Sequence, residues 1–522
     1  MTVVTVASQK REPGPFSAAR WRAPAAVAAG ALPALAFPEP SWWWFAHVAL
    51  VPWLLLVRSA RSPRRAALEA WLGGAGFLLA VHHWLLPSLH VFILLLAALL
   101  GLLWVPWGLL VHRLLGGRPG PGRVAAALVL VPSGWLLAEL VRSWEYLGGP
   151  WGLLGASQWQ VPPALRLASV GGVWLVGLLV VAVNTALTAV LALPRARLVG
   201  LAGLVGCAAV TAGVWWWAPV PRAAGTVRIA IVQPGVVDGP GSVRDRLDRE
   251  EALTRTLAGR GVDLVVWGES SVGTDLGGDP ALRARLAALS RTVGADLLVN
   301  VDARRSDRPG IFKSSVLIGP DGPTGGRYDK MRLVPFGEYV PARSLLGWAT
   351  SVGKAATEDR RRGERQVVLP LPSGRGAGLR IGPLVCFESA FPDMSRKLAA
   401  DGAQVLVAQS STSTFQHSWA PEQHASLAAL RAAETWRPMV HATLTGTSTV
   451  ADARGRMIGR PLGTDTSAAA VRDVPLASGT SPYVRYGDWA VYAALAALAL
   501  YCAVESALFV RRRVKASAPS PR

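Results

Sequence analysis

Long apolar runs alternate with short polar segments over the first 221 residues of the chain and again after residue 487. A helix needs about 20 largely apolar residues to cross the hydrocarbon core of a bilayer. Most of the runs have about this length, although Pro33 and Pro52 interrupt the first two. The pattern therefore predicts eight membrane-spanning helices, at residues 24–37, 41–57, 68–86, 91–112, 124–141, 167–192, 198–217 and 488–510.

Between residues 222 and 487, short β-rich runs alternate with helical ones. Such alternation favours an α/β sandwich built on buried sheets. We therefore expect an N-terminal membrane bundle at 1–221, an α/β domain at 222–487, and a last span with a basic tail at 488–522. Within the domain, the predicted strands are Val227–Val232, Val262–Trp267, Ala295–Val299, Val316–Asp321, Leu379–Cys386, Val405–Ala408 and Met439–Val450, and the predicted helices are Ser242–Ala258, Pro280–Arg291 and Pro421–Glu434.

The composition of the chain is that of a membrane protein. Of its 522 residues, 51% are apolar and only 17% are charged, whereas soluble domains average about 25% charged residues. These values exclude an ordinary soluble enzyme, and the high apolar content excludes a disordered chain. The net charge of +21 is compatible with a nucleic-acid partner only if the basic residues form a binding surface.

Most of the excess positive charge flanks the apolar runs instead. Residues 222–487 carry 34 basic and 26 acidic side chains, whereas the rest of the chain carries 20 basic and only 7 acidic ones. Of those 20, 18 fall on one side of the predicted spans, and only Arg142 and Arg166 fall on the other. Because cytoplasmic loops are enriched in Lys and Arg, we expect a multi-pass protein of the cell (inner) membrane with both termini in the cytoplasm and the α/β domain outside. A nucleic-acid partner is not expected.

Two features of the membrane part leave alternatives open. Ala34-Leu35-Ala36 follows a basic segment and a short apolar run, so the N-terminus also resembles a cleavable signal peptide. The predicted outer loop Arg142–Gln160 carries Trp144, Tyr146, Trp151 and Trp159. An aromatic belt at the membrane interface explains these residues. The loop is also a candidate roof over a lipid-binding site, with Trp151 as a candidate substrate-binding residue.

Cysteine usage singles out one residue of the α/β domain. Cys207 and Cys502 lie in predicted spans, and Cys386 alone lies in the domain. The domain therefore has neither an internal disulfide nor a cysteine cluster for zinc, and we expect no metal ion and no cofactor. Cys386 is either an inert buried thiol or a nucleophile. Its place between a predicted strand and a following helix favours the nucleophile, because backbone N–H groups lie nearby.

A thiol nucleophile needs a base, and the domain offers two kinds. Its histidines are His417, His424 and His441, and a Cys–His protease arrangement through His424 is conceivable. Glu269, just after a predicted buried strand, can serve instead if burial raises its pKa. Lys330 could then hold the resulting oxyanion through its ammonium group.

Three sequence boxes resemble the Glu–Lys–Cys signature of the nitrilase superfamily. They are Trp267-Gly268-Glu269, Tyr328-Asp329-Lys330 with Pro335-Phe336-Gly337-Glu338, and Cys386-Phe387-Glu388. A nitrilase domain with these boxes, set between membrane spans, is similar to that of bacterial apolipoprotein N-acyltransferases, and the resemblance covers essentially the whole chain. It implies a multi-span α-helical membrane bundle joined to an extracytoplasmic α/β domain with the αββα sandwich of nitrilases.

The resemblance also implies a reaction. An acyl chain moves from a membrane phospholipid to Cys386 as a thioester, and then to the α-amino group of the diacylglyceryl-modified cysteine of an apolipoprotein. Glu269 takes the proton of the thiol, while Lys330 and the backbone N–H of Phe387 stabilise the oxyanion. The resemblance further implies supporting positions around this triad, at Glu338 and Glu388.

Two other functions stay open at this point. Departures from the family pattern at Gly268, Phe387 and Ser314-Ser315 leave the substrate preference undetermined. A membrane-tethered amidase or nitrilase, acting on soluble C–N bonds, would use the same triad. A non-catalytic membrane scaffold, for example a partner of a polyprenol-phosphate glycosyltransferase, would not need Cys386.

Overall fold

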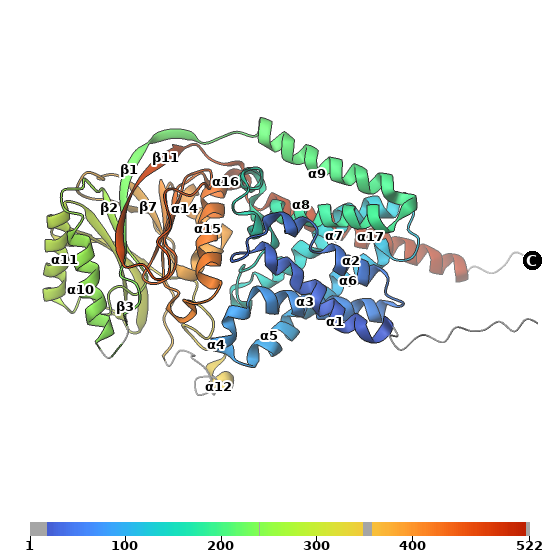
Figure 1. Ribbon diagram of the computed structural model, residues 1–522, viewed down its shortest axis with the longest axis horizontal. Coiled ribbons are helices and arrows are strands. Elements are labelled where there is room, and N and C mark those ends of the chain that lie inside the picture. The colour runs from blue at the N-terminus through green and yellow to red at the C-terminus, as the bar shows by residue number, and fades with distance from the viewer. Residues whose placement is uncertain (1–17, 238, 240, 348–357, 518–522) are drawn as a thin grey trace, which may run out of the picture.

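The computed structural model describes residues 18–237, 239, 241–347 and 358–517. A bundle of helices lies at one end of the molecule and an α/β sandwich at the other, as Figure 1 shows. The helices before residue 218 and the last helix, α17 (Trp489–Ser517), form the bundle. The strands lie between Arg222 and Ser478.

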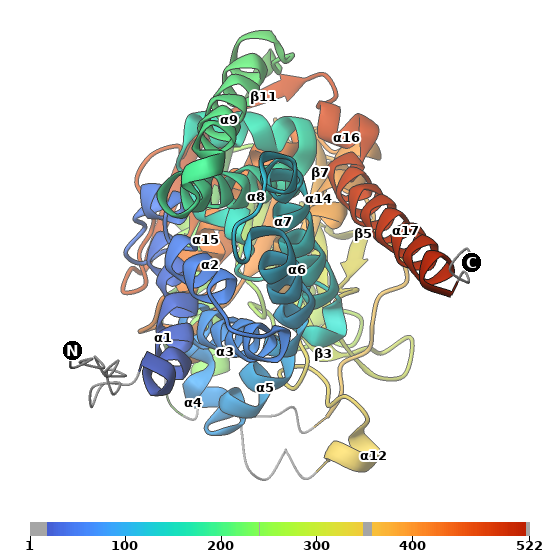
Figure 2. The same ribbon diagram turned by 90° about the vertical axis from the view of Figure 1, so that its right-hand side faces the viewer.

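Five helical segments in the described part of the chain are long and apolar enough to cross a membrane. A sixth span results if α3 (Pro63–Val81) and the helical turns His83–Leu89, which are bent by 66°, are counted as one. Figure 2 shows α9 and α17 at the periphery of the bundle. The five segments are α5 (Phe92–Gly101) continued by α6 (Val105–Leu115), α7 (Pro121–Arg142), α8 (Pro162–Ala192), α9 (Arg197–Trp217) and α17.

The prediction of eight full-length spans is wrong for the first two apolar runs. Within the described residues they form α1 (Ala18–Ala31) and α2 (Val51–Arg58), which have 14 and 8 residues and are too short to cross a bilayer. The chain between them turns through short 3-10 helices within residues 32–47. Pro33 and Pro38 contribute to this break, because proline has no backbone N–H to continue an α-helix.

Aromatic side chains fill the middle of the bundle. Trp53, Trp107 and Trp135 are buried and meet edge to face, with ring centroids 4.8–5.8 Å apart. Phe77 and Trp104 extend this cluster. Since each aromatic ring buries a large apolar surface, the cluster holds α2, α3, α6 and α7 together.

The α/β domain consists of two sheets packed face to face. The first has the strand order β11-β1-β2-β3-β4-β5 and the second has the order β10-β9-β8-β7-β6. Strands β1 to β3 run parallel to one another, and so do strands β7 to β9. The strands are β1 (Arg222–Gln233), β2 (Leu264–Trp267), β3 (Asp296–Arg304), β4 (Ile311–Gly319), β5 (Gly322–Asp329), β6 (Leu369–Pro370), β7 (Arg380–Val385), β8 (Val405–Ser410), β9 (Met439–Thr443), β10 (Thr449–Ala451) and β11 (Ala468–Ser478).

Helices cover both outer faces of the sandwich. On one side, α10 (Ser242–Arg255) and α11 (Pro280–Val293) cover the first sheet. On the other, α14 (Pro392–Ala400) and α15 (Ala420–Thr435) lie between the second sheet and the bundle (Figure 1). Apolar side chains from both sheets fill the space between them. This arrangement confirms the predicted αββα sandwich.

The sandwich and the bundle share one apolar core through α15. Leu427 and Leu430 on α15 belong to the same buried cluster as Leu165 and Val173 on α8. Burial of this apolar surface is the main force that holds the two parts together. The catalytic candidates are therefore fixed relative to the membrane helices.

A break in α8 is completed by a side chain of the α/β domain. Gly171 and Gly172 leave the helical conformation, Gly172 with a φ of +70°. The N–H of Val173 donates to Glu434 Oε1 of α15 over 2.7 Å, and Arg431 donates to the same oxygen over 3.0 Å. A membrane helix can be interrupted only where the freed backbone groups find partners. Glu434 supplies such a partner.

Glu434→Ala is expected to destabilise the protein by about 3–5 kcal/mol, because the buried N–H of Val173 loses its acceptor and the buried guanidinium of Arg431 loses its carboxylate partner. Thermal unfolding of the purified protein in detergent measures the change. Glu434→Gln is the matched control, since it keeps an acceptor oxygen at the same place, and we expect it to unfold closer to the wild-type temperature. Equal losses in the two variants would show that this hydrogen bond does not stabilise the fold.

Candidate active site

Three strand ends bring the predicted catalytic residues together in the α/β domain. Glu269 follows β2, Lys330 follows β5 and Cys386 follows β7. The N–H of Glu269 donates over 3.0 Å to the carbonyl of Ser410, which ends β8, so the two sheets are joined at this point. Glu269 is 3% exposed and Lys330 is 1% exposed, whereas Cys386 keeps part of its surface exposed. Cys386 thus lies beside buried charges with part of the residue exposed.

Cys386 occupies a sharp turn between β7 and the 3-10 helix Cys386–Ala390. Its φ of +51° is a left-handed conformation that is unfavourable for a residue with a Cβ atom. The N–H groups of the first helical turn, that of Phe387 among them, have no acceptor within the helix. They are therefore available to hold an oxyanion next to the thiol.

Two lysines and two glutamates form the charged part of the site. Lys330 Nζ lies 3.2 Å from Glu269 Oε1 and 2.8 Å from Glu338 Oε1. Lys313 Nζ lies 2.8 Å from Glu269 Oε1 and 3.1 Å from Glu338 Oε1. Each of these carboxylate oxygens is thus shared by both ammonium groups. Because the four charges balance, they can be buried together, which a single unpaired charge could not be.

Sequence reasoning misses Lys313. It places the start of the strand at Val316, whereas β4 extends over Ile311–Gly319 and includes Lys313. The residues that follow Lys313 on β4 are all buried. A lysine in such a strand is itself a signal, because a buried ammonium group requires a carboxylate partner.

Burial and the nearby charges together set the pKa values of the groups in the site. Burial and the neighbouring Glu269 carboxylate raise the pKa of the Cys386 thiol to about 12. Burial also acts to raise the pKa of Glu269, but Lys313 and Lys330 outweigh it and lower that pKa to about 2. The expectation that burial raises the pKa of Glu269 is therefore wrong, because two ammonium groups contact the carboxylate. At neutral pH the site holds a neutral thiol beside an ionised carboxylate, to which the thiol is hydrogen bonded.

Glu388 contacts the main chain around the site. Its carboxylate accepts hydrogen bonds from the Tyr328 hydroxyl at 2.6 Å, from the Met331 N–H at 2.7 Å and from the Val385 N–H at 2.8 Å. These donors flank Lys330 on one side and Cys386 on the other. Glu388 therefore ties the turn that carries the lysine to the turn that carries the thiol. Glu338, by contrast, binds Lys330 directly.

The side chain of Phe387 packs toward the membrane bundle. Its ring lies 4.9 Å from that of Phe391, edge to face, and both rings lie against Gly149 in the loop between α7 and α8.

Gly268, just before Glu269, leaves no room for a side chain, since a Cβ atom there would lie 2.0 Å from the backbone nitrogen of Leu444. This departure from the family pattern thus permits close approach of two chain segments beside Glu269.

His424 does not form a catalytic pair through its ring in the described structure. Its Nε2 lies 3.1 Å from the carbonyl oxygen of Cys386 and its Nδ1 lies 3.1 Å from Ser410 Oγ. Burial lowers the pKa of His424 to about 4, so the ring is neutral at neutral pH. The ring of His441 meets it edge to face with centroids 4.6 Å apart, and His417 is exposed. The described residues contain no group of three or more His, Cys, Asp or Glu side chains that could hold a metal ion.

Trp151 reaches the site from the membrane part. Its Nε1 donates to Gln423 Oε1 on α15 over 3.0 Å, and its ring lies 5.1 Å from that of His424. Trp84 donates to the same Gln423 oxygen over 3.2 Å and lies 5.3 Å from Trp151, centroid to centroid. An aromatic surface from the bundle therefore borders the residues around Cys386.

Both halves of the chain match models of known protein families. Residues 29–186 match the family model described as the apolipoprotein N-acyltransferase N-terminal domain, and residues 228–481 match that of the carbon-nitrogen hydrolases. An apolipoprotein N-acyltransferase of Geobacter metallireducens is 30% identical over 94% of this chain and 95% of its own. One of Azotobacter vinelandii is 31% identical over 95% of this chain and 96% of its own.

Proposed function

Since the chain belongs to the apolipoprotein N-acyltransferase family, we propose that it transfers a fatty acyl chain from a membrane phospholipid, through a thioester on Cys386, to the α-amino group of a lipoprotein's diacylglyceryl-cysteine. The observation that carries this proposal is the contact of one carboxylate, Glu269, with the Cys386 thiol and with two lysines. A base, a nucleophile and a cation are thus within reach of one another.

In the first half-reaction, Glu269 takes the proton from the Cys386 thiol as the sulfur attacks the ester carbonyl of the phospholipid. The negative charge that develops on the carbonyl oxygen is stabilised by the Lys330 ammonium and by the N–H of Phe387. The bond to the glycerol oxygen then breaks, and Glu269 returns the proton to that oxygen. The products are a thioester on Cys386 and a lysophospholipid.

In the second half-reaction, the α-amino group of the lipoprotein attacks the thioester carbon. Glu269 takes a proton from the nitrogen, the carbon–sulfur bond breaks, and the proton returns to the Cys386 sulfur. The thioester must meet the amine before water does. The buried indoles of Trp151 and Trp84 support this order, because they pack apolar groups against the residues around the thiol and so help to exclude water.

The proposal also covers the membrane in which the protein lies and its orientation there. The structure has the apolar helices of a membrane protein, and 18 of the 20 basic residues outside positions 222–487 fall on one side of the spans predicted from the sequence. By the enrichment of Lys and Arg in cytoplasmic loops, both termini are cytoplasmic and the domain at 222–487 faces outward from the inner membrane. The lipid substrates then lie in the bilayer that holds the bundle.

The two alternatives receive less support. An amidase acting on soluble compounds needs no aromatic surface shared with membrane helices. A non-catalytic scaffold needs no buried cluster of four charges, which is costly unless it serves chemistry. Nothing in the family comparison supports a polyprenol-phosphate glycosyltransferase as a partner.

Intact mass spectrometry tests the proposed function. The full-length protein in detergent is incubated with a phosphatidylethanolamine of defined acyl chains, and we expect a mass increase of one acyl group at Cys386. Addition of a diacylglyceryl-cysteine peptide should remove this adduct and place the acyl group on the peptide. No adduct, together with hydrolysis of a small amide in the absence of lipid, would establish the amidase instead.

Lys313→Met is expected to shift the acidic limb of the pH–rate profile to higher pH. Lys313 and Lys330 together lower the pKa of Glu269, so the loss of one ammonium group raises that pKa, by about 1–3 units for a charge at this distance. Protonated Glu269 cannot act as the base, so activity then fails at a higher pH than in the wild type. The dependence of kcat/KM on pH measures the shift.

Lys397→Met is the control for this experiment, because Lys397 pairs with Asp401 at the surface and its loss should leave the profile unchanged. An acidic limb of Lys313→Met that coincides with that of the wild type would contradict the role of Lys313 in setting the basicity of Glu269.

A further inference from the structure

A pocket lies away from the Cys386 site, where the α/β domain meets the membrane helices. Its volume is about 440 Å³. It is lined by α8, by the end of α9 and the segment that follows, by the end of α15 and by the loop after β10. Ala433, in its wall, lies about 13 Å along α15 from His424. The pocket is thus separate from the site described above.

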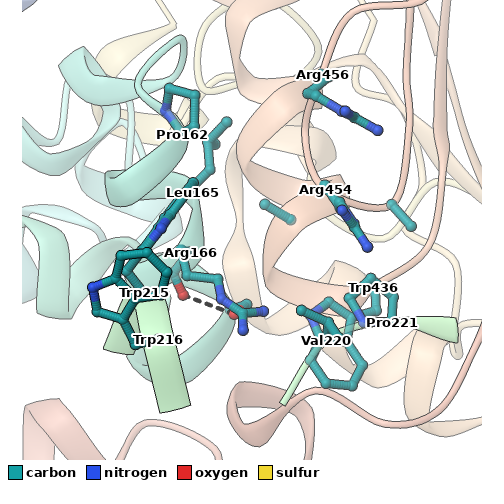
Figure 3. Close-up of a pocket in the computed structure, with 13 residues that line it drawn as sticks. Pro162, Leu165, Arg166, Trp215, Trp216, Val220, Pro221, Trp436, Arg454 and Arg456 are labelled. Carbon is teal, nitrogen blue, oxygen red and sulfur yellow. Dashed lines mark hydrogen bonds between the residues drawn. The ribbon is translucent and has the colours of Figure 1, made fainter. Parts of the chain in front are cut away.

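Three arginines line this pocket: Arg166 of α8, and Arg454 and Arg456 of the loop. Figure 3 shows Arg166 between the α9 tryptophans and Val220–Pro221, with Arg454 and Arg456 on the opposite wall. Arg166 donates to the carbonyls of Ala218 and of Pro219, the latter over 2.7 Å. These bonds use two of its five N–H groups.

The pocket carries more positive charge than its neighbours neutralise. Arg456 pairs with Asp452 over 2.9 Å. Among the described residues, no hydrogen bond or ion pair of the Arg454 side chain is found. Arg166 binds main-chain carbonyls and not a carboxylate. Two guanidinium groups at one pocket therefore lack a counterion within the described structure.

The backbone holds these charges close together. Gly455, between two of the arginines, has a φ of +80°. A Cβ atom there would lie 2.6 Å from the carbonyl oxygen of Ala429 on α15 and 3.0 Å from the Leu165 side chain on α8. The loop is thus pressed against both helices. Close packing of this loop, and not attraction between the arginines, holds Arg454 in the pocket wall opposite Arg166.

The position of the pocket also indicates where its ligand comes from. Trp215 and Trp216, at the end of the apolar helix α9, are 42% and 73% exposed. Tryptophans at the end of a membrane helix lie at the level of the lipid headgroups. Leu165, Val220 and Trp436 add apolar surface to the same wall. The pocket thus joins cationic groups and an apolar surface at headgroup depth.

We propose that this pocket binds the phosphate group of an anionic phospholipid such as phosphatidylglycerol, with Arg166 and Arg454 as its donors and the acyl chains along the exposed surface of α9. Arginine matches the geometry of phosphate oxygens, and basic pockets between membrane helices bind anionic headgroups. The bound lipid would hold the 452–456 loop of the α/β domain at the membrane surface. The site does not depend on the acyl transfer proposed for Cys386.

Native mass spectrometry of the full-length protein in detergent tests this site. Dissociation constants are measured for phosphatidylglycerol and for phosphatidylcholine of the same acyl chains. We expect tighter binding of phosphatidylglycerol, and about fivefold weaker binding of it by Arg454→Gln, as for one arginine near a lipid surface. Arg456→Gln, at an arginine that already pairs with Asp452, should weaken it less than Arg454→Gln does. These variants spare Arg166, whose hydrogen bonds secure the end of α9.

Arg260→Gln is the matched control, because it removes one exposed positive charge of the α/β domain from the segment between α10 and β2, which does not line the pocket. Equal affinity for phosphatidylglycerol in Arg454→Gln and Arg260→Gln would overturn the proposal. Displacement of the lipid by inorganic phosphate, beyond the effect of chloride at equal ionic strength, would show a site for free phosphate instead. Acylation of Cys386 in detergent should be unchanged in Arg454→Gln, so the result is independent of the proposed reaction.

Discussion

Replacement of Cys386 by serine is expected to lower the rate of N-acyl transfer by at least about 1,000-fold. The hydroxyl of serine is a far weaker acid than a thiol, so transfer of its proton to Glu269 during attack on the ester is far less favourable. No acyl adduct should be detectable by mass spectrometry. The rate is measured with a diacylglyceryl-cysteine peptide and a phospholipid as substrates.

Two other cysteines provide the control for this experiment. Cys207 lies on α9 and Cys502 lies on α17, both away from the Glu269 cluster. We expect Cys207→Ser and Cys502→Ser to keep the wild-type rate and the acyl adduct. An adduct that persists in Cys386→Ser, or one that disappears in either control variant, would assign the nucleophile to another residue.

Glu269→Gln is expected to lower the transfer rate by about 1,000-fold, within the usual range for loss of a general acid–base residue. The same change should raise the reactivity of the Cys386 thiol toward an alkylating reagent. The Glu269 carboxylate raises the pKa of Cys386, whereas Lys330 and Lys313 lower it. Without the carboxylate the pKa of the thiol falls, so we expect Cys386 to react faster with iodoacetamide at neutral pH while catalysis is lost.

This pair of measurements separates catalysis from folding. An unfolded variant would lose activity and would also be alkylated more readily at Cys207, which is partly buried in the folded protein, and peptide mapping detects this change. Glu364→Gln removes an exposed carboxylate of the same domain and should change neither rate. A Glu269→Gln variant with slower transfer but unchanged alkylation of Cys386 would contradict the electrostatic description of the site.

The parts of the site that sequence motifs encode could be predicted, whereas the contacts between motifs could not. The sequence boxes around Glu269, Lys330 and Cys386 lie just after strands. Because strand ends lie close together at one edge of a sandwich, these three residues could be expected to form one site. The second lysine, Lys313, has no such box. Its role depends on the strand pairing that brings β4 beside the loop of Glu269, and one sequence does not show this pairing.

The opposite pKa shifts of Glu269 and Cys386 have the same origin. Burial alone predicts that both pKa values rise. The structure shows two ammonium groups on the carboxylate oxygen, and their charges outweigh burial for Glu269 but not for Cys386. The sign of a shift at a site with several charges thus depends on distances that a sequence does not contain.

The membrane part was predictable where apolar runs are uninterrupted. The runs that became α7, α8 and α9 are long enough that hydropathy identifies them without further information. The first two runs contain prolines, and whether such a run bends or spans depends on its packing. Here the first run breaks into a 3-10 helix that contains Pro33, and α2 packs through Trp53 against Trp107 of α6.

The break in α8 has a consequence for the order in which the protein is made. Val173 and the glutamate that accepts its N–H are 261 residues apart in the chain, so α8 is synthesised long before its partner. Until the ribosome has passed residue 434, the broken helix has one backbone donor without this acceptor at a depth where water is scarce. We therefore expect this contact between the bundle and the α/β domain to form only after residue 434 has been synthesised, which makes it a late step of biogenesis.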